Sequence, residues 1–176
     1  MMKKSLILLS GLVAANTAFA EPRPAVESRP AFSLRAEMFE PSQSSETVTE
    51  KSPAGNILRC EFQPGKGPIL TKRIPEGLLR DAIGMRFRAR ADSHRQLCLT
   101  IATTDEDDRY QFVSVGKHWQ VIDIRFDDMQ RRSNVDPSST WKSGSIERIT
   151  LTDRNPSATR GVLRIADWSF HRTHQR

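Results

Sequence analysis

Hydrophobic and polar positions alternate through the centre of this chain. The segment Ile83–Ala91 places an apolar residue at every second position, namely Met85, Phe87 and Ala89, and arginines at the positions between them. Successive side chains of a strand point to opposite faces, so this segment predicts a strand with one apolar and one cationic face. Three further segments show strand-like patterns of similar length, so four consecutive strands are expected here: Arg95–Thr103, Asp108–Val115 and His118–Phe126 follow Ile83–Ala91.

Further strand-like segments flank this centre on both sides. They are Ala31–Phe39, Ile57–Phe62, Pro68–Ile74, Ser145–Thr152 and Val162–Phe170, with a short edge strand at Glu46–Thr49 as an option. The segment Pro75–Asp81 predicts a single helical turn, and no longer amphipathic helix is indicated. This series of short strands without a long helix predicts an all-β fold, a two-sheet antiparallel jelly-roll sandwich spanning residues 32–171.

The first twenty residues have the pattern of a secretory signal peptide. Lys3 and Lys4 precede an apolar run that is too short to span a bilayer, and the small residues Ala18 and Ala20 suit cleavage after Ala20. Residues 21–31, rich in proline, predict a flexible lead-in, and residues 172–176 a polar tail. The chain is therefore expected to be exported, periplasmic or secreted, with no membrane span after cleavage. An uncleaved membrane anchor is the alternative.

The net charge and the composition of the chain indicate which classes of binding partner to expect. The net charge of +6 includes the two lysines of the leader, and the remaining excess is mostly arginine interleaved with acidic residues. Such a distribution is typical of a solvated surface, so no nucleic-acid partner is expected. With 37% hydrophobic residues over 176 positions, one domain with a thin core is favoured over two domains.

The two cysteines fall on different strand faces. Cys60 shares a face with the apolar residues Leu58 and Phe62, whereas Cys98 lies between the apolar residues Leu97 and Leu99. If both apolar sets face the core, the two sulfur atoms lie on opposite sides of a sheet. The pattern therefore favours two thiols, and an oxidising compartment leaves a disulfide as the alternative.

Two stretches resemble a known family. Trp119 opens a strand that ends in Phe126-Asp127-Asp128-Met129, and the chain closes with the strand that runs from Gly161 to Trp168 and beyond. The order of strands from Phe32 to Phe170 is similar to that of the galactose-binding-domain-like jelly rolls, notably family-11-type carbohydrate-binding modules and intermediate-associated-protein-30 domains. This resemblance implies a non-catalytic binding module, and no phosphate loop or nucleophile elbow points to an enzyme.

The resemblance also implies two adjacent acids in the closing strand, one of which helps to hold a structural calcium ion. In this chain the corresponding pair reads Ala166-Asp167, so Asp167 is the only metal ligand carried over. Calcium needs several oxygen ligands. The sequence therefore predicts no cofactor, with calcium at Asp167 as the alternative.

The polar face of the central strands is the candidate ligand-binding site. It is expected to contain Arg86, Arg88, Arg90, Asp123 and Arg125, with Tyr110 as the aromatic ring by strand parity and Trp141 from a polar loop. If the strands of Arg88 and Asp123 are neighbours, as the resemblance implies, these two side chains can pair across the ladder. Guanidinium and carboxylate groups offer directed hydrogen bonds to sugar hydroxyls.

These features predict an exported, non-catalytic module that binds a carbohydrate or similar polar ligand on its arginine-lined face. The first alternative is a protein-interaction or assembly module of the intermediate-associated-protein type in the cell envelope, so the expected partner is a glycan or an envelope protein. The second alternative is that the arginine-lined face is a charged surface that keeps the sandwich soluble.

Overall fold

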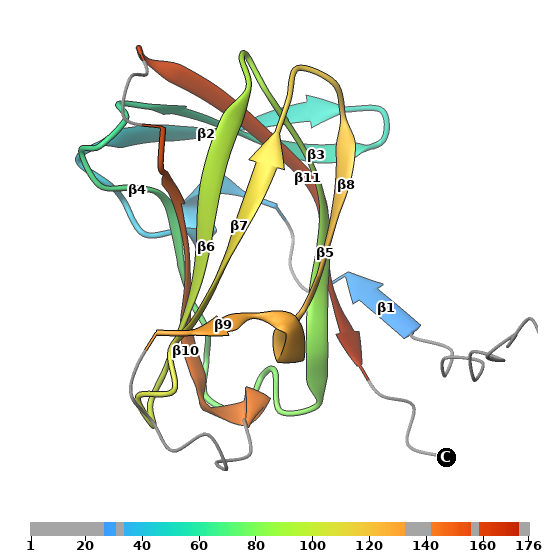
Figure 1. The fold of residues 1–176 in the computed structure, drawn as a ribbon. Coiled ribbons are helices and arrows are strands. Elements are labelled where there is room, and N and C mark those ends of the chain that lie inside the picture. The colour runs from blue at the N-terminus through green and yellow to red at the C-terminus, as the bar shows by residue number, and fades with distance from the viewer. Residues whose placement is uncertain (1–26, 31–33, 133–141, 156–158, 173–176) are drawn as a thin grey trace, which may run out of the picture.

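Two antiparallel β-sheets pack face to face in the computed structural model of this protein (Figure 1). The structure describes residues 27–30, 34–132, 142–155 and 159–172. The first sheet has the strand order β2 (Ser45–Ser52), β3 (Gly55–Phe62), β11 (Gly161–Arg172), β5 (Ala82–Ala91), β8 (Gln120–Arg125), and β1 (Glu27–Pro30) also pairs with β11. The second sheet has the order β4 (Pro68–Arg73), β10 (Ile146–Asp153), β6 (Arg95–Thr103), β7 (Arg109–Val115), β9 (Gln130–Arg131).

The chain passes repeatedly from one sheet to the other. β5 belongs to the first sheet, β6 and β7 to the second, β8 to the first, β9 and β10 to the second, and β11 returns to the first. Helical structure in the described residues is limited to short 3-10 turns, η1 (Ala36–Met38), η2 (Phe126–Asp128) and η3 (Ser143–Ser145). This architecture confirms the predicted all-β sandwich of jelly-roll type.

The core lies between the sheets and follows the alternation of the sequence. The apolar residues of the central strands are buried, among them Met85, Phe87, Leu97, Leu99, Ile122 and Ile124. The intervening arginines of β5 point away from this core. Alternation with a period of two places every second side chain on the inner face, which is why the interior could be predicted.

A β-bulge in β11 changes the face on which its later residues lie. Ala166 pairs with Arg88 and Ser169 with Arg86, so β11 contains one more residue than β5 over this stretch. Asp167 adopts a positive φ of 54° at the bulge and remains exposed. Trp168 consequently turns inward, where its ring lies 5.1 Å from that of Phe87.

Three segments differ from the predicted elements. In the segment predicted as strand Ala31–Phe39, residues 31–33 lie outside the described residues and the remainder contains the 3-10 turn η1. The segment Pro75–Asp81 forms consecutive turns instead of a helical turn, and Gly77 has a φ of 72°, which is incompatible with a right-handed helix. Glu27–Pro30, assigned to the flexible lead-in, pairs with the end of β11 as a strand.

The cysteines lie where strand parity predicted. Cys60 is fully buried in the core, Cys98 faces the outside of the second sheet, and both are free thiols. Burial raises the pKa of the Cys60 thiol to about 11, although a hydrogen bond from Thr47 opposes the effect, so this thiol stays protonated at neutral pH. Within the described ranges, no helix has the length and apolar character needed to cross a membrane, and residues 1–20 lie outside them.

Candidate functional site

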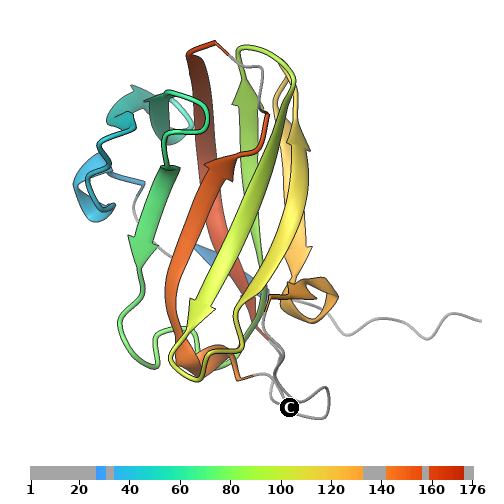
Figure 2. The same ribbon diagram turned by 60° about the vertical axis from the view of Figure 1, so that its left-hand side comes forward.

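The outer face of the second sheet carries a groove of about 580 Å³. In Figure 2 this sheet is turned toward the viewer, with β10 in orange and β6 and β7 in yellow-green and yellow. The lining side chains from β6 and β7 alternate with core residues of the same strands, which is why they point outward. The groove is lined by Gln96, Cys98, Thr100, Tyr110, Phe112, Arg131, Arg132 and Arg154.

An aromatic pair forms one wall of this groove. The rings of Tyr110 and Phe112, two residues apart on β7, meet edge to face with 5.7 Å between their centroids. Phe112 is 47% exposed, and among the residues that the structure describes it is one of the few large apolar side chains that face solvent. An exposed aromatic ring surrounded by polar groups is typical of a binding surface.

The strand register places small side chains beside these rings. Cys98 of β6 is opposite Phe112, and Thr100 is opposite Tyr110. On the next strand, β10, two threonines continue the same rows, with Thr152 opposite Cys98 and Thr150 opposite Thr100. Large rings on one strand and short side chains on the next two leave open space over the sheet, and this difference in size creates the groove.

Arginines lie at both ends of the groove. At one end, the backbone N–H of Arg154 donates to the carbonyl of Gln96 (2.9 Å). At the other end, β9 pairs with the start of β7, and Arg131 Nε lies 3.5 Å from Oδ1 of the buried Asp107. Arg132 follows directly. The described lining therefore combines an aromatic surface with guanidinium, amide and hydroxyl groups that can bond a polar ligand.

A buried ion pair supports the end of the groove that carries Arg154. Arg95 Nη1 lies 3.3 Å from Asp153 Oδ2, and both side chains are almost fully buried. The Arg95 guanidinium also lies 5.4 Å from the ring centroid of Phe62 and bonds the carbonyl of Arg160 (3.4 Å). These contacts hold the end of β10 and the start of β11 in place beside the groove.

The predicted arginine face lies on the other sheet. Arg86, Arg88 and Arg90 lie on the outer side of β5, and β8 is the neighbour of β5 as expected. The predicted pair between Arg88 and Asp123 is wrong, because the register places Arg86 directly opposite Asp123. Arg86 Nε donates to Asp123 Oδ2 (2.9 Å), and Arg88 instead pairs with Asp167 at the bulge of β11.

This arginine face is occupied by contacts within the protein. The guanidiniums of Arg88 and Arg90 lie 5.5 and 5.1 Å from the ring centroid of Trp119, and His171 Nε2 lies 2.9 Å from Asp123 Oδ1. Partial burial would raise the pKa of Asp123, but hydrogen bonds from Arg86 and His171 outweigh it and hold this pKa below its ordinary value. Most of the charge here is already compensated.

Of the remaining predicted residues, Arg125 joins this face, since it is exposed on β8 two residues after Asp123 and opposite Gly84 of β5. Tyr110 lies on the outer side of the second sheet, separated from the arginines by the whole core, and Trp141 lies outside the described residues. The predicted site is therefore divided between two faces. Phe112, which the sequence reasoning missed, could have been found from its spacing of two residues from Tyr110.

Asp167 is poorly suited to hold calcium. Its carboxylate pairs with the guanidinium of Arg88, and β11 contains no other acidic residue. Among the residues described by the structure, no group of three or more His, Cys, Asp or Glu side chains could hold a metal ion. Calcium requires six to eight oxygen ligands, so the residues present at Asp167 do not fit it.

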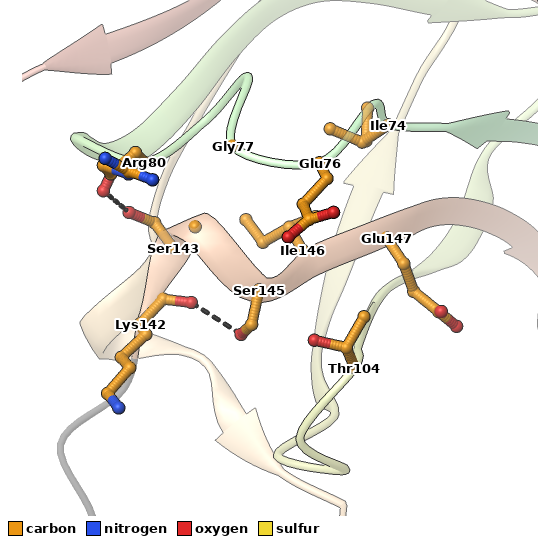
Figure 3. A pocket seen from close by; sticks show the side chains of 11 residues that line it. Ile74, Glu76, Gly77, Arg80, Thr104, Lys142, Ser143, Ser145, Ile146 and Glu147 are labelled. Atoms are coloured by element: carbon orange, nitrogen blue, oxygen red, sulfur yellow. Dashed lines mark hydrogen bonds between the residues drawn. The ribbon is translucent and has the colours of Figure 1, made fainter.

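A second hollow of about 630 Å³ lies at one end of the sandwich, between residues 74–80 and 142–147 (Figure 3). The hydroxyl of Ser143 donates to the carbonyl of Arg80 (2.6 Å), and the hydroxyl of Ser145 donates to the carbonyl of Lys142 (2.8 Å). Its described lining consists of aliphatic, hydroxyl and charged groups without an aromatic ring. The groove on the second sheet is therefore the better candidate for a binding site.

The fold is a β-sandwich of the kind found in carbohydrate-binding modules. The chain is similar to a family 11 carbohydrate-binding module from Clostridium thermocellum in complex with a β-1,3-1,4-mixed-linked tetrasaccharide. The TM-score is 0.62 and the identity 13%, over 85% of this chain and 96% of that one. The corresponding module of the cellulosomal cellulase Lic26A-Cel5E from Clostridium thermocellum matches with a TM-score of 0.63 and 12% identity, over 88% and 100%.

A family 30 carbohydrate-binding module is also similar, with a TM-score of 0.51 and 12% identity over 79% of this chain and 80% of that one. No protein-family model and no curated protein sequence matches the chain. These comparisons confirm the predicted resemblance to family-11-type modules at the level of the fold. At 12–13% identity, a ligand for this chain has to be argued from its own residues.

Proposed function

We propose that this chain is a non-catalytic module that binds a carbohydrate chain along the groove of the second sheet. The observation that carries the proposal is the exposed ring of Phe112, held edge to face against Tyr110 above a floor of small side chains. A sugar ring has an apolar face of C–H groups and an equatorial rim of hydroxyls. An exposed ring can stack on the first, and the guanidinium, amide and hydroxyl groups of the lining can bond the second.

The groove suits this role better than the arginine face of the first sheet. On that face, Arg86 and Arg88 are paired with carboxylates and Trp119 is covered by two guanidiniums. A ligand there would have to displace ion pairs before gaining new hydrogen bonds. In the groove, the aromatic wall is exposed before any ligand arrives, so binding need not displace intramolecular ion pairs.

Similarity of fold supports the same class of ligand. The modules compared above are described as carbohydrate-binding, and they cover most of this chain. The proposal also includes export, on the pattern of residues 1–20, which lie outside the described residues. Amino-terminal sequencing of the protein recovered from the cell envelope or medium would test cleavage after Ala20.

Affinity electrophoresis and calorimetry against a panel of soluble polysaccharides test the binding function. The change Phe112→Ala should weaken binding of the retained polysaccharide about tenfold, since a lost aromatic stack costs about 1.4 kcal/mol. Its thermal unfolding should change little, because Phe112 is half exposed. Val121→Ala, an exposed apolar position on the first sheet, is the matched control and should bind like the wild type.

The same panel separates the alternatives. If Arg88→Ala weakens binding and Phe112→Ala does not, the ligand occupies the arginine face that the sequence predicted. If no polysaccharide is retained by the folded wild-type protein, the carbohydrate proposal fails, and the protein-interaction alternative becomes the better explanation of the module.

A further inference from the structure

The charge of the groove indicates which carbohydrates it would select. Of its eight lining residues, three are arginines, and the described lining contains no aspartate or glutamate. Arg131 Nε lies 3.5 Å from Oδ1 of the buried Asp107, which also pairs with Arg109. Arg132 and Arg154 have no ionic partner within the part of the chain that the structure describes. With respect to the acidic residues that the structure describes, Arg132 and Arg154 therefore give the groove two uncompensated positive charges.

These two charges lie at opposite ends of the aromatic wall. Arg154 is joined through its backbone to Gln96, at one end of the β6 row. Arg132 is joined through its backbone to Asp108, just before β7 and close to the Tyr110 end. Between Gln96 and Thr100 the strand advances by four residues, which corresponds to about 13 Å. A chain that crosses the aromatic wall therefore meets a guanidinium at each end.

From this arrangement we propose that the groove selects an acidic polysaccharide, one whose sugars carry carboxylate or sulfate groups. The inference rests on the proposed function and specifies its ligand class. A guanidinium binds a carboxylate or sulfate through two parallel, charge-assisted hydrogen bonds, which are stronger than its bonds to neutral hydroxyls. A groove with positive charge and no acidic lining also attracts anionic chains from solution and gives neutral chains no such advantage.

Other candidate anion sites on the molecule are weaker. On the first sheet, carboxylates of the same sheet pair with four arginines, Arg59, Arg86, Arg88 and Arg164, and Arg90 lies over the ring of Trp119. At the end hollow, the cationic Arg80 and Lys142 share the lining with Glu76 and Glu147. In both places acids of the protein already balance much of the positive charge, so a ligand anion would compete with them.

The test compares each acidic polysaccharide with its own neutral form. Polygalacturonate, alginate and chondroitin sulfate, and their carboxyl-reduced or desulfated counterparts, would be titrated into the full chain at about 50 and about 200 mM NaCl. At the lower salt, at least one acidic chain should bind roughly tenfold more tightly than its neutral counterpart, and the preference should shrink at the higher salt.

Variants show whether the groove arginines produce this preference. Arg132→Gln combined with Arg154→Gln should bring the two Kd values to within about twofold and leave binding of the neutral chain unchanged. Arg125→Gln removes one exposed arginine from the other sheet and should keep the preference that each single groove change reduces, which makes it the matched control for the loss of one charge.

Four alternative outcomes would each contradict the inference, and each has a different explanation. Equal Kd values for acidic and neutral chains overturn it and leave the carbohydrate-binding function intact. A loss of preference in Arg125→Gln as large as in the groove variant assigns the effect to net charge. Binding of poly-glutamate as tight as that of the acidic polysaccharides shows a general polyanion surface. Retention of no chain in the panel removes the proposed function itself.

Discussion

The buried ion pair beside the groove provides the sharpest test of the structure. Asp153 and Arg95 are 2% and 3% exposed, and at an effective dielectric constant of about 20 two unit charges 3.3 Å apart attract each other by about 5 kcal/mol. Asp153→Asn removes the charge and keeps the shape. The amide oxygen can still accept the hydrogen bond that Asp153 Oδ1 receives from the backbone N–H of Asn155 (3.0 Å).

The expected loss of stability is about 3 kcal/mol. Removing one partner of a buried pair costs about 3–5 kcal/mol, because the other charge stays buried without compensation. The lower end applies because Arg95 keeps the half-exposed carboxylate of Asp92, 3.4 Å from Nη2. Urea unfolding followed by tryptophan fluorescence measures the change, since Trp168 is buried in the core. With a slope of about 2 kcal/mol per M, the midpoint should fall by about 1.5 M.

An exposed ion pair supplies the control. Glu147 and Arg148 are about half exposed and 4.0 Å apart, so Glu147→Gln should shift the midpoint by no more than about 0.3 M. The reasoning is refuted if Asp153→Asn shifts the midpoint as little as Glu147→Gln. It is also refuted if Arg95→Met and Asp153→Asn lower stability additively in the double variant, because a coupled pair should deviate from additivity.

Two further results are expected for the first sheet. A Cβ at Gly84 would lie 2.4 Å from the carbonyl oxygen of Ile124, so Gly84→Ala should lower the free energy of unfolding by about 1–3 kcal/mol, measured by thermal or urea unfolding. Gly116→Ala is the control and should not destabilise the fold, because the atom nearest to its Cβ would be 3.9 Å away. The pKa of Asp123 lies below its ordinary value of 3.8, so its contribution to stability is present above pH 3.8 and is lost as the pH falls through the lowered pKa. The stability difference between the wild type and Asp123→Asn should therefore narrow on acidification, and a constant difference would contradict the assignment.

Much of the fold could be predicted because burial in a strand alternates with a period of two. The apolar residues Met85 and Phe87 identified the inner face of β5, and the same parity separated Cys60 from Cys98. The change of face in β11 is also visible in the sequence, where the spacing of apolar residues changes from two to three between Ile165 and Trp168. Only the structure showed that a bulge absorbs the extra residue.

The candidate site was harder to predict because a site depends on which sheet each strand joins. Parity correctly placed Tyr110 on an outer face, but there are two outer faces, and β7 belongs to the sheet opposite β5. The partner of Arg88 depended on the register between strands and on the bulge that carries Asp167. Neither the register nor the bulge is encoded by the pattern of a single strand.

The alternation within each central strand is enough to show which of its side chains face inward, because burying apolar area is a local property of an alternating strand. Which outward side chains become neighbours depends on the folded arrangement of the strands. The fold joins β6, β7, β9 and β10 into one surface, which brings Phe112, Tyr110 and the arginines of the groove together. On the first sheet, Asp123 and Asp167 pair with Arg86 and Arg88 of β5. Contacts between residues distant in sequence depend on how the strands are ordered and registered, and those are set by the packing of the whole chain.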